Sequence, residues 1–299
     1  MKTYVLVAGD PGVASLIEAA ASLGQPVVAV VAGSGDLAQV VNCPGVDQVI
    51  WLGEVGDHAL EAFAEGAATV IEQEPGILMS GRRPAERVLL GVAAARIMAP
   101  VVSGVQSVAL DDGKTLVTHG VYGGIAQAIT FFDGPVALCM DGGAAVNGGG
   151  SAEVVNVEVI PSAISVVSMT ANTQTSVDLG SATRVIGVGR GLKAEEDLRL
   201  IEDLSTKVQA EIGCSRPLSE GLNWLGRDQY IGVSGAHISP DLYIMIGISG
   251  QLQHVSGCRG SKIIVSINTD KDAPATHEAD YVLTGDLYAL VPALIEALQ

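Results

Sequence analysis

Short apolar runs recur through the first half of the chain, separated by polar turns and by segments with helical spacing. Leu16 and Ala20 share one face of a helix predicted over 15–24, and Pro84 can occupy the first turn of a helix that runs to about Met98. The predicted strands, most of them apolar on both faces, comprise residues 4–9, 27–33, 48–53, 77–80, 101–110 and 135–140. Such strands alternating with helices are typical of a mainly parallel sheet that helices cover on both sides.

The same alternation starts again in the second half. A helix is predicted over 194–210, and a last helix follows Asp286, which is a candidate N-cap. Pro292 inside that last helix is expected to kink or restart it. The predicted strands of this half comprise residues 184–189, 230–234, 241–249, 262–267 and 281–284. We therefore predict an α/β protein with two domains, each a mainly parallel sheet flanked by helices, of which the second is doubly wound.

A change of composition separates the two halves. The glycine-rich run at 141–151 predicts a flexible segment, and the polar run at 161–183 has no helical period. We interpret the region as a crossing strand followed by a linker. The predicted domains are an N-terminal α/β domain over 1–180, which includes the linker, and a C-terminal domain over 181–299.

Composition narrows the classes of function. With 48% hydrophobic residues, a chain of 299 residues can bury a sizeable core, so disorder is not expected. The formal net charge is −17, with a balance of −12 in residues 1–180 and −5 in residues 181–299. This surface would repel a nucleic-acid backbone, so no nucleic-acid partner is expected. An anionic ligand would meet a weaker repulsion in the second half.

The cysteines and the N-terminus indicate a cytoplasmic protein. The four cysteines include no C-x-x-C pair, and no His/Cys spacing resembles a zinc site, so reduced thiols are expected. The first ten residues lack the apolar stretch of a signal peptide and are instead typical of a first strand. No apolar run approaches the ~18 residues of a transmembrane helix, so no membrane span is expected.

Candidate chemistry lies in three segments that follow predicted strands or apolar runs of the second half. They are GVGRGL at 187–192, GCSRP at 213–217 and GISGQLQH at 247–254. Ligands of doubly wound sheets bind beyond the carboxyl ends of the strands, so these segments are expected to face one crevice. In the third segment we expect the glycines to let the backbone approach a ligand, and a helix starting at about Gln251 to present free N–H groups.

Other interpretations remain open at this point. Each glycine can serve turn chemistry alone, and His254 can be a structural histidine. GVGRGL can also belong to an NAD-dependent dehydrogenase, although its G-x-G-x-G spacing departs from the G-x-G-x-x-G fingerprint and Glu211 is misplaced for the ribose-binding acid. A third alternative is a non-redox protein that binds an adenine nucleotide.

Taken together, the motifs resemble one family. Residues 184–298 resemble the FAD-binding domain of electron transfer flavoprotein α subunits, in a bacterial form, and the first half resembles that family's N-terminal domain more loosely. The resemblance comprises VGRGL, CSRP, I-S-G-x-x-Q-H, I-N-x-D-x-x-A-P at 267–274, A-D-Y at 279–281 and G-D-L at 285–287. It implies FAD as the cofactor.

The resemblance also implies a set of cofactor-binding residues. They are Arg190, Ser215, Arg216, Val233, Ser234, Ser249, Gly250, Gln251, Gln253, His254, Asn268, Asp286 and Leu287. Three of them would tune the flavin: Arg216 at the isoalloxazine, His254 near its pyrimidine side, and Ser234 with its hydroxyl at N5. Cations or donors at the pyrimidine side would favour reduced flavin.

The other implied roles concern the rest of the cofactor. Arg190 would lie over the flavin or its pyrophosphate, and Asn268 and Asp286 would contact the adenosine half. N-capping explains Asp286 equally well. Val233 stands where many relatives have a polar residue.

The function that the resemblance implies is electron transport and not enzymatic catalysis. The chain would be the larger subunit of a heterodimer with an electron transfer flavoprotein β subunit, which would hold AMP or a second flavin. Electrons would pass between a flavin-dependent dehydrogenase, of the acyl-CoA type, and another donor or acceptor such as a quinone- or ferredoxin-linked protein.

Overall fold

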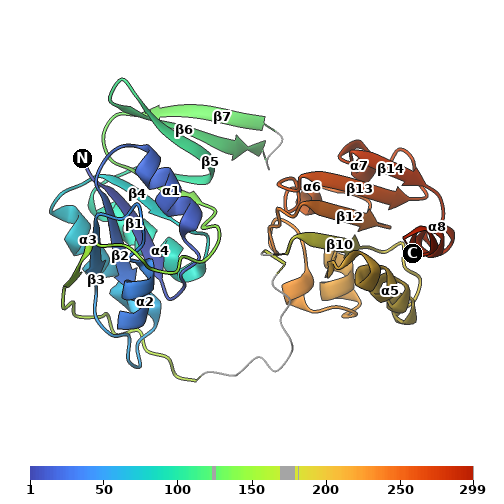
Figure 1. Cartoon of the computed structure of the whole chain (residues 1–299), viewed down its shortest axis with the longest axis horizontal. Coiled ribbons are helices and arrows are strands. Elements are labelled where there is room, and N and C mark those ends of the chain that lie inside the picture. Colours follow the sequence, from blue (N-terminus) through green and yellow to red (C-terminus); the bar gives the residue numbers. More distant parts are fainter. Residues whose placement is uncertain (123–125, 169–178, 181, 299) are drawn as a thin grey trace. The chain divides into compact units, whose positions relative to one another are not determined.

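The computed structural model describes residues 1–122, 126–168, 179–180 and 182–298, and the chain divides into two compact units (Figure 1). Unit 1 comprises Met1–Thr170 and unit 2 comprises Ala171–Gln299. The predicted boundary between 180 and 181 adjoins Ser181, and most of the predicted linker falls on 169–178. Those positions lie outside the described residues.

Unit 1 is built on a sheet of nine strands, counted over the described residues, in the order β7-β6-β5-β8-β4-β1-β2-β3-β9. The strands are β1 (Thr3–Ala8), β2 (Val27–Ala32), β3 (Gln48–Trp51), β4 (Ile77–Ser80), β5 (Val101–Asp111), β6 (Lys114–Val121), β7 (Ala126–Phe132), β8 (Val136–Met140) and β9 (Glu153–Asn156). Only the β5/β6 and β6/β7 pairs are antiparallel. β9 pairs with β3 and is the predicted crossing strand.

Both faces of this sheet are covered by helices, as the apolar strands predict. The helices are α1 (Ala14–Ser22), α2 (Gly35–Val41), α3 (Ala64–Glu72) and α4 (Pro84–Arg96), with a 3-10 turn η1 (Leu60–Phe63) before α3. Along β1, Val5 and Val7 pack with α1 and α2, whereas Tyr4 and Leu6 pack with α3 and α4. Strand residues therefore alternate between two apolar clusters, which stabilise the sheet from opposite sides.

The glycine-rich run at 141–151, predicted to be flexible, is held by backbone hydrogen bonds. The carbonyl of Gly142 accepts from Ser15 N at 3.0 Å, and Gly148 N donates to Val40 O at 2.7 Å. Gly150 N donates to Asn42 O at 2.8 Å. The glycines let this segment approach the ends of α1 and α2 closely, so it packs against the unit instead of hanging free.

Within its described residues, unit 2 contains a fully parallel sheet of five strands, in the order β11-β10-β12-β13-β14. The strands are β10 (Arg184–Val188), β11 (Glu211–Cys214), β12 (Leu242–Ile246), β13 (Ile263–Asn268) and β14 (Tyr281–Thr284). The helices are α5 (Leu198–Val208), α6 (Leu252–Val255), α7 (Pro274–His277) and α8 (Leu287–Ala297), with short turns η3 (Glu195–Asp197), η4 (Pro217–Gly221) and η5 (Arg227–Gln229). The predicted fold class is confirmed in both units.

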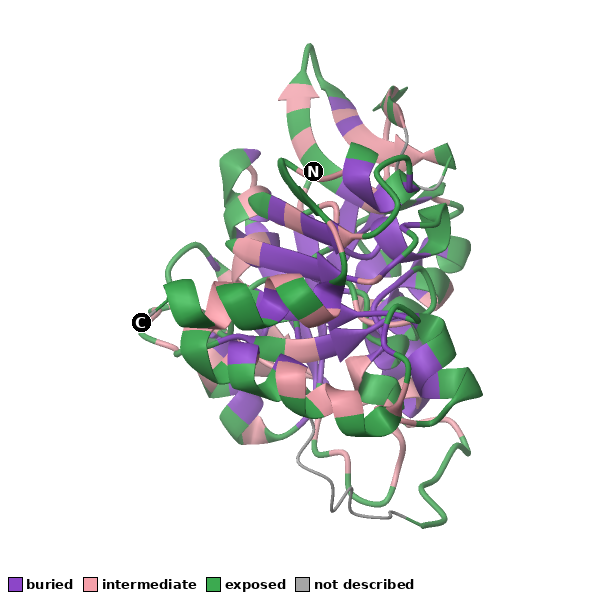
Figure 2. Cartoon of the chain, turned by 90° about the vertical axis from the view of Figure 1, so that its right-hand side faces the viewer, coloured by how far each residue is buried: buried purple, intermediate pink, exposed green. Residues whose placement is uncertain are grey.

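Helices cover the two faces of this sheet unequally. Ile201 of α5 and Val291 of α8 pack against Ile186, Ile244 and neighbouring strand residues on one face. α7 and irregular segments cover the other face. Strands β10 and β12 in the middle of this sheet are mostly buried, and Figure 2 shows the helices as striped, buried toward the sheet and exposed outward. This pattern is what amphipathic helices on a two-faced sheet produce.

Three predicted elements of unit 2 differ from the structure. Residues 230–234 do not form a strand: Tyr230 and Ile231 make only isolated bridges, and the second strand of the sheet is β11. The helix predicted over 194–210 begins at Leu198, after a 3-10 turn. The last helix continues through Pro292, where the predicted restart does not occur.

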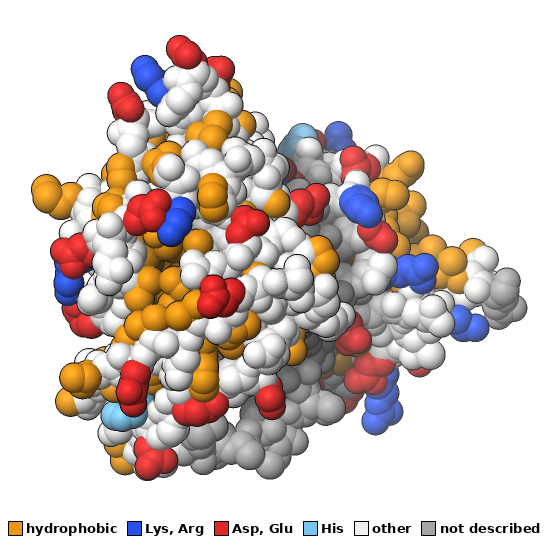
Figure 3. All heavy atoms as spheres, turned by 60° about the vertical axis from the view of Figure 1, so that its left-hand side comes forward, with side chains coloured by type: hydrophobic (Ala, Val, Ile, Leu, Met, Phe, Trp, Pro, Cys, Tyr) orange, Lys and Arg blue, Asp and Glu red, His pale blue; other side chains and the backbone are white. Residues whose placement is uncertain are grey.

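Two further features of the structure are the charge of its surface and the length of its helices. Figure 3 shows acidic side chains scattered over the visible face, in keeping with the net charge of −17. Among the described residues, no helix is both long enough and apolar enough to span a membrane.

Candidate functional site

The three strand-end segments of unit 2 meet where the strand order reverses. β10 lies between β11 and β12. After β10 the chain adds β11 at one edge of β10, and it then crosses over to add β12 at the opposite edge of β10. The segments that contain Arg190, Ser215 and Ser249 follow the carboxyl ends of β10, β11 and β12. Open α/β sheets bind ligands at such a switch point. The predicted juxtaposition of the three segments is confirmed.

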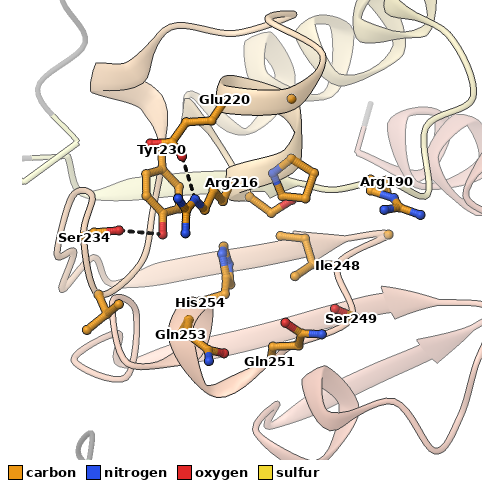
Figure 4. A pocket seen from close by; sticks show the side chains of 15 residues that line it. Arg190, Arg216, Glu220, Tyr230, Ser234, Ile248, Ser249, Gln251, Gln253 and His254 are labelled. Carbon is orange, nitrogen blue, oxygen red and sulfur yellow. Dashed lines mark hydrogen bonds and ion pairs between the residues drawn. The ribbon is translucent and has the colours of Figure 1, made fainter.

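A cavity of about 940 Å³ lies at this point (Figure 4). Its lining comprises Arg190, Ser215, Arg216, Pro217, Glu220, Gly221, Tyr230, Val233, Ser234, Gly247, Ile248, Ser249, Gln251, Gln253 and His254. Nine of the thirteen predicted site residues are among them. Pro217, Glu220, Tyr230 and Ile248 were not predicted. Glu220 follows Arg216 by four residues, a spacing of opposite charges that could have identified it.

A second cavity, of about 480 Å³, adjoins the first, because Gly247 and Ser249 line both. Its lining includes three more predicted residues, Asn268, Asp286 and Leu287, and a lysine that was not predicted, Lys193. The remaining predicted residue, Gly250, lines neither cavity. A Cβ atom there would lie 2.1 Å from Ala275 N, so Gly250 permits a close packing of backbone against α7.

Gly187, the first glycine of GVGRGL, belongs to β10 and not to the turn. A Cβ atom at this position would lie 2.0 Å from the Tyr243 hydroxyl oxygen. Tyr243 is fully buried on β12, and its hydroxyl is 2.7 Å from His254 Nε2. Gly187 therefore makes room for a buried tyrosine that holds His254 in the cavity wall.

The later glycines let two turns touch. A Cβ atom at Gly189 would lie 2.5 Å from the Gly247 carbonyl oxygen, and one at Gly191 would lie 2.6 Å from Gly247 Cα. Gly191 N donates to Gly247 O at 3.0 Å, and Gly247 has φ +60°. The sequence prediction assigned Gly247 to close contact with a ligand. Gly247 does line both cavities. However, the closest reason that a side chain cannot be present at Gly247 is its contact with the turn that contains Gly191.

His254 is a neutral residue of the wall. It is 7% exposed, and burial lowers the pKa of its imidazole to about 4, against a small opposing effect of the Ile231 carbonyl. Nδ1 makes no hydrogen bond of good geometry within the described part of the chain. The imidazole of His254 is thus a neutral hydrogen-bonding group, whereas the sequence left open a positively charged one.

We expect this burial to make stability pH-dependent. The pKa of His254 is lower in the folded chain (about 4) than the ordinary 6.5, so the unfolded chain binds the proton first. Its contribution to stability is complete above pH 6.5 and is lost as the pH falls toward 4. Between pH 7 and 5.5 the loss should be roughly 1 kcal/mol, measured by urea unfolding of the full chain.

His254→Gln should remove this part of the pH dependence. His277→Gln, at an exposed histidine of the same unit, should keep it. An identical loss of stability between pH 7 and 5.5 in the wild type and in His254→Gln would contradict the assignment.

Arg216 follows β11 and projects into the larger cavity (Figure 4). Its Nε donates to Glu220 Oε2 at 2.6 Å, and this carboxylate raises the pKa of the guanidinium further. On the same side of the cavity, the hydroxyls of Tyr230 and Ser234 are 3.3 Å apart. Arg190 lies on the other side of His254 in Figure 4. The larger cavity therefore presents two cations and several donors.

Polar contacts organise the smaller cavity. Asn268 Nδ2 donates to Ile248 O at 2.8 Å, which ties β13 to the turn after β12. Asp286 caps α8, since its Oδ1 accepts from Tyr288 N at 3.0 Å. Because Asp286 also lines the cavity, the two explanations left open for it are compatible. Lys193 Nζ stands 4.8 Å from the centroid of the Tyr288 ring.

The thiols of this unit are not reactive groups. Cys214 and Cys258 are fully buried, and burial raises the pKa of each to about 12. Both are free cysteines, as predicted. They fill the apolar clusters beside the site and do not line either cavity.

The paired cavities fit an elongated anionic ligand with a flat ring system. The larger one combines apolar walls, including Ile248 and Pro217, with the cations Arg190 and Arg216. The smaller one offers a lysine, an amide and a carboxylate. Apolar walls suit an aromatic ring, cations suit phosphates, and an amide with a carboxylate suits a ribose or an adenine. The residues present therefore fit FAD.

Comparison with known proteins identifies the family. Residues 178–259 match the electron transfer flavoprotein FAD-binding domain, and residues 9–162 match the electron transfer flavoprotein domain. The chain is 37% identical to a protein of Escherichia coli (strain K12) named electron transfer flavoprotein subunit YdiR, over 96% of this chain and 94% of that one. It is 33% identical to protein FixB of Salmonella typhimurium and 32% identical to protein FixB of Escherichia coli O157:H7, each over 95% of this chain and 93% of theirs.

Both halves of the chain match in the same order as in the family, and full-length relatives exceed 30% identity. The chain therefore belongs to the electron transfer flavoprotein family and is of its α-subunit type.

Proposed function

We propose that this chain binds FAD across the two adjoining cavities of unit 2 and carries electrons as one subunit of a heterodimer with an electron transfer flavoprotein β subunit. The family consists of electron carriers and not of catalytic enzymes. The observation that supports the binding site is the pair of cavities at the switch point, which share Gly247 and Ser249 and contain most of the residues matching the family motifs.

In this proposal the larger cavity receives the isoalloxazine ring and the smaller one the adenosine half. FAD supplies the redox chemistry, because its ring system accepts and releases electrons. Arg216 and Ser234 would face the ring, and Arg190 would balance the charge of the pyrophosphate or of the ring. Asn268, Asp286 and Leu287 would hold the adenosine half.

His254 would orient the ring as a neutral hydrogen-bonding group. Gln251, Gln253 and Ser249 would contribute polar contacts from the segment after β12. Since α6 spans only Leu252–Val255, the predicted helix start amounts to a single turn. Val233 is 57% exposed, so its side chain can cover the outer face of the ring.

The proposed electron partners are flavin-dependent dehydrogenases of the acyl-CoA type and a redox acceptor or donor linked to quinone or ferredoxin. The proposed domains are residues 1–180, which would pack against the β subunit, and residues 181–299, which would hold FAD. The cytoplasm is the proposed location.

Co-production with the companion β subunit tests this proposal. The purified complex should be yellow, contain at least one FAD for each copy of this chain, and lose its visible absorbance on reduction with dithionite. Bound nucleotides, counted after acid release, will also show whether the β subunit holds AMP or a second flavin. A folded complex that contains no flavin, and takes up none when FAD is added, would refute the proposal. Binding of NADH instead would favour a dehydrogenase.

A further inference from the structure

One acidic side chain stands inside the larger cavity. Among the residues that line it, within the described part of the chain, Arg190 and Arg216 are the basic residues and Glu220 is the one acid. Glu220 accepts a hydrogen bond from Arg216 Nε at 2.6 Å (Figure 4). The side chains of Arg216 and Glu220 are 66% and 33% exposed. The cavity that we propose for the anionic cofactor therefore contains a carboxylate that partly neutralises one of its two cations.

The local backbone fixes this arrangement. Arg216 directly precedes the turn η4, which has Pro217 at its start. Leu218 and Ser219 are buried and anchor the turn against the core. Glu220 lies one turn beyond Arg216, so its carboxylate reaches back to the guanidinium from the same short segment. Both members of the pair therefore come from this one segment, at a spacing of four residues.

The hydrogen bond also leaves part of the guanidinium available. Glu220 occupies Nε, and within the described residues the two Nη groups of Arg216 make no hydrogen bond. A guanidinium has five N–H donors in a fixed plane, so an acceptor at Nε determines which way the remaining donors face. In Figure 4 the guanidinium lies between Tyr230 and His254, within the cavity.

From these observations we infer that Glu220 is a positioning residue for electron transfer: it orients Arg216 toward the bound flavin and offsets part of its positive charge, which holds the reduction potential of the flavin below the value that Arg216 alone would set. The inference rests on the proposed function, because it requires flavin in this cavity. It concerns a residue that acts through Arg216 and is not a group that exchanges electrons.

Glu220→Gln separates the two effects. A glutamine oxygen can still accept from Arg216 Nε, so the orientation is kept, whereas the negative charge is lost. An uncompensated Arg216 stabilises the extra negative charge of a reduced flavin more strongly. The reduction potential of the bound flavin should therefore rise in Glu220→Gln. FAD content should stay at the wild-type level.

The measurement is a potentiometric titration of the full-length chain in complex with its β subunit. Glu278→Gln is the matched control. It alters an ion pair of the same kind, Arg259 Nη2 to Glu278 Oε1 at 2.6 Å, whose residues line neither cavity. Its potential should equal that of the wild type. In an Arg216→Ala background, Glu220→Gln should shift the potential less than it does beside Arg216.

The outcomes are distinct. A flavin-loaded complex whose potential is unchanged or lowered by Glu220→Gln refutes the inference and leaves the proposed function intact. A rise of equal size with and without Arg216 also refutes it, since Glu220 would then act on the flavin directly. A wild-type complex without flavin overturns the proposed function and this inference together.

Discussion

Gly187→Ala is expected to destabilise unit 2 by about 3 kcal/mol, the upper end of the usual range for overpacking a core, and to weaken FAD retention. The added Cβ atom would lie 2.0 Å from the Tyr243 hydroxyl oxygen and 2.7 Å from ring carbon Cζ. Tyr243 is fully buried on the central strand β12, so its side chain cannot simply move out into solvent. Its displacement would break the hydrogen bond to His254 in the cavity wall.

Urea unfolding of the full chain measures this effect. The chain has two tryptophans, so in a Trp51→Phe background the fluorescence of Trp224 reports on unit 2. Gly221→Ala is the control for stability, because a Cβ atom there meets no atom within 4 Å outside its own stretch of chain. Adding Tyr243→Phe to Gly187→Ala should restore part of the stability by removing the closest atom. A near-neutral Gly187→Ala would show that the space at Gly187 is not required.

Much of the fold is predictable from local patterns. The first two strands of unit 1 have side chains buried on both faces of the sheet, and their apolar runs predict this directly. The differences arise where local preference and tertiary packing diverge. Residues 230–234 have the β-branched and aromatic composition of a strand, yet Tyr230 and Ile231 fill apolar clusters beside the sheet. β11 contains a glutamate and a glycine, both disfavoured in strands, and pairing with β10 decides its conformation.

The location of the candidate site is likewise predictable, but its internal contacts are not. Glycine-rich segments after parallel strands indicate a crevice, and the family motifs within them indicate FAD. Nothing in the sequence shows that Gly187 faces a tyrosine from another strand. A tyrosine in an apolar run, such as Tyr243, has the pattern of an ordinary core residue. Only the three-dimensional register places its hydroxyl beside both Gly187 and His254.

Within this one motif, glycine is required for two different reasons at different positions. Gly187 accommodates a buried side chain, whereas Gly189 and Gly191 accommodate the turn that contains Gly247. Packing within the protein therefore accounts for all three glycines of the G-x-G-x-G motif, and Gly191 also lines the smaller cavity. In the proposed function, Arg190 would supply the charged group of this segment to the cofactor.

Arg216→Ala is expected to lower the reduction potential of the bound flavin, opposite in sign to the effect of Glu220→Gln. In the proposed function, removing the guanidinium would take away a cation that favours the reduced form. A tenfold loss of preference for that form corresponds to ~59 mV for one electron, and we expect a change of this order. Potentiometric titration of the complex measures the shift.

Two variants separate the charge of Arg216 from its shape. Arg216→Lys keeps the positive charge but not the planar donors, and should fall between the wild type and Arg216→Ala. Arg259→Ala removes an arginine of the same unit that lines neither cavity, and should leave the potential unchanged. If Arg216→Ala binds FAD normally and keeps the wild-type potential, Arg216 does not act on the flavin. The cation that balances reduced flavin would then have to be sought at Arg190, on the opposite side of His254.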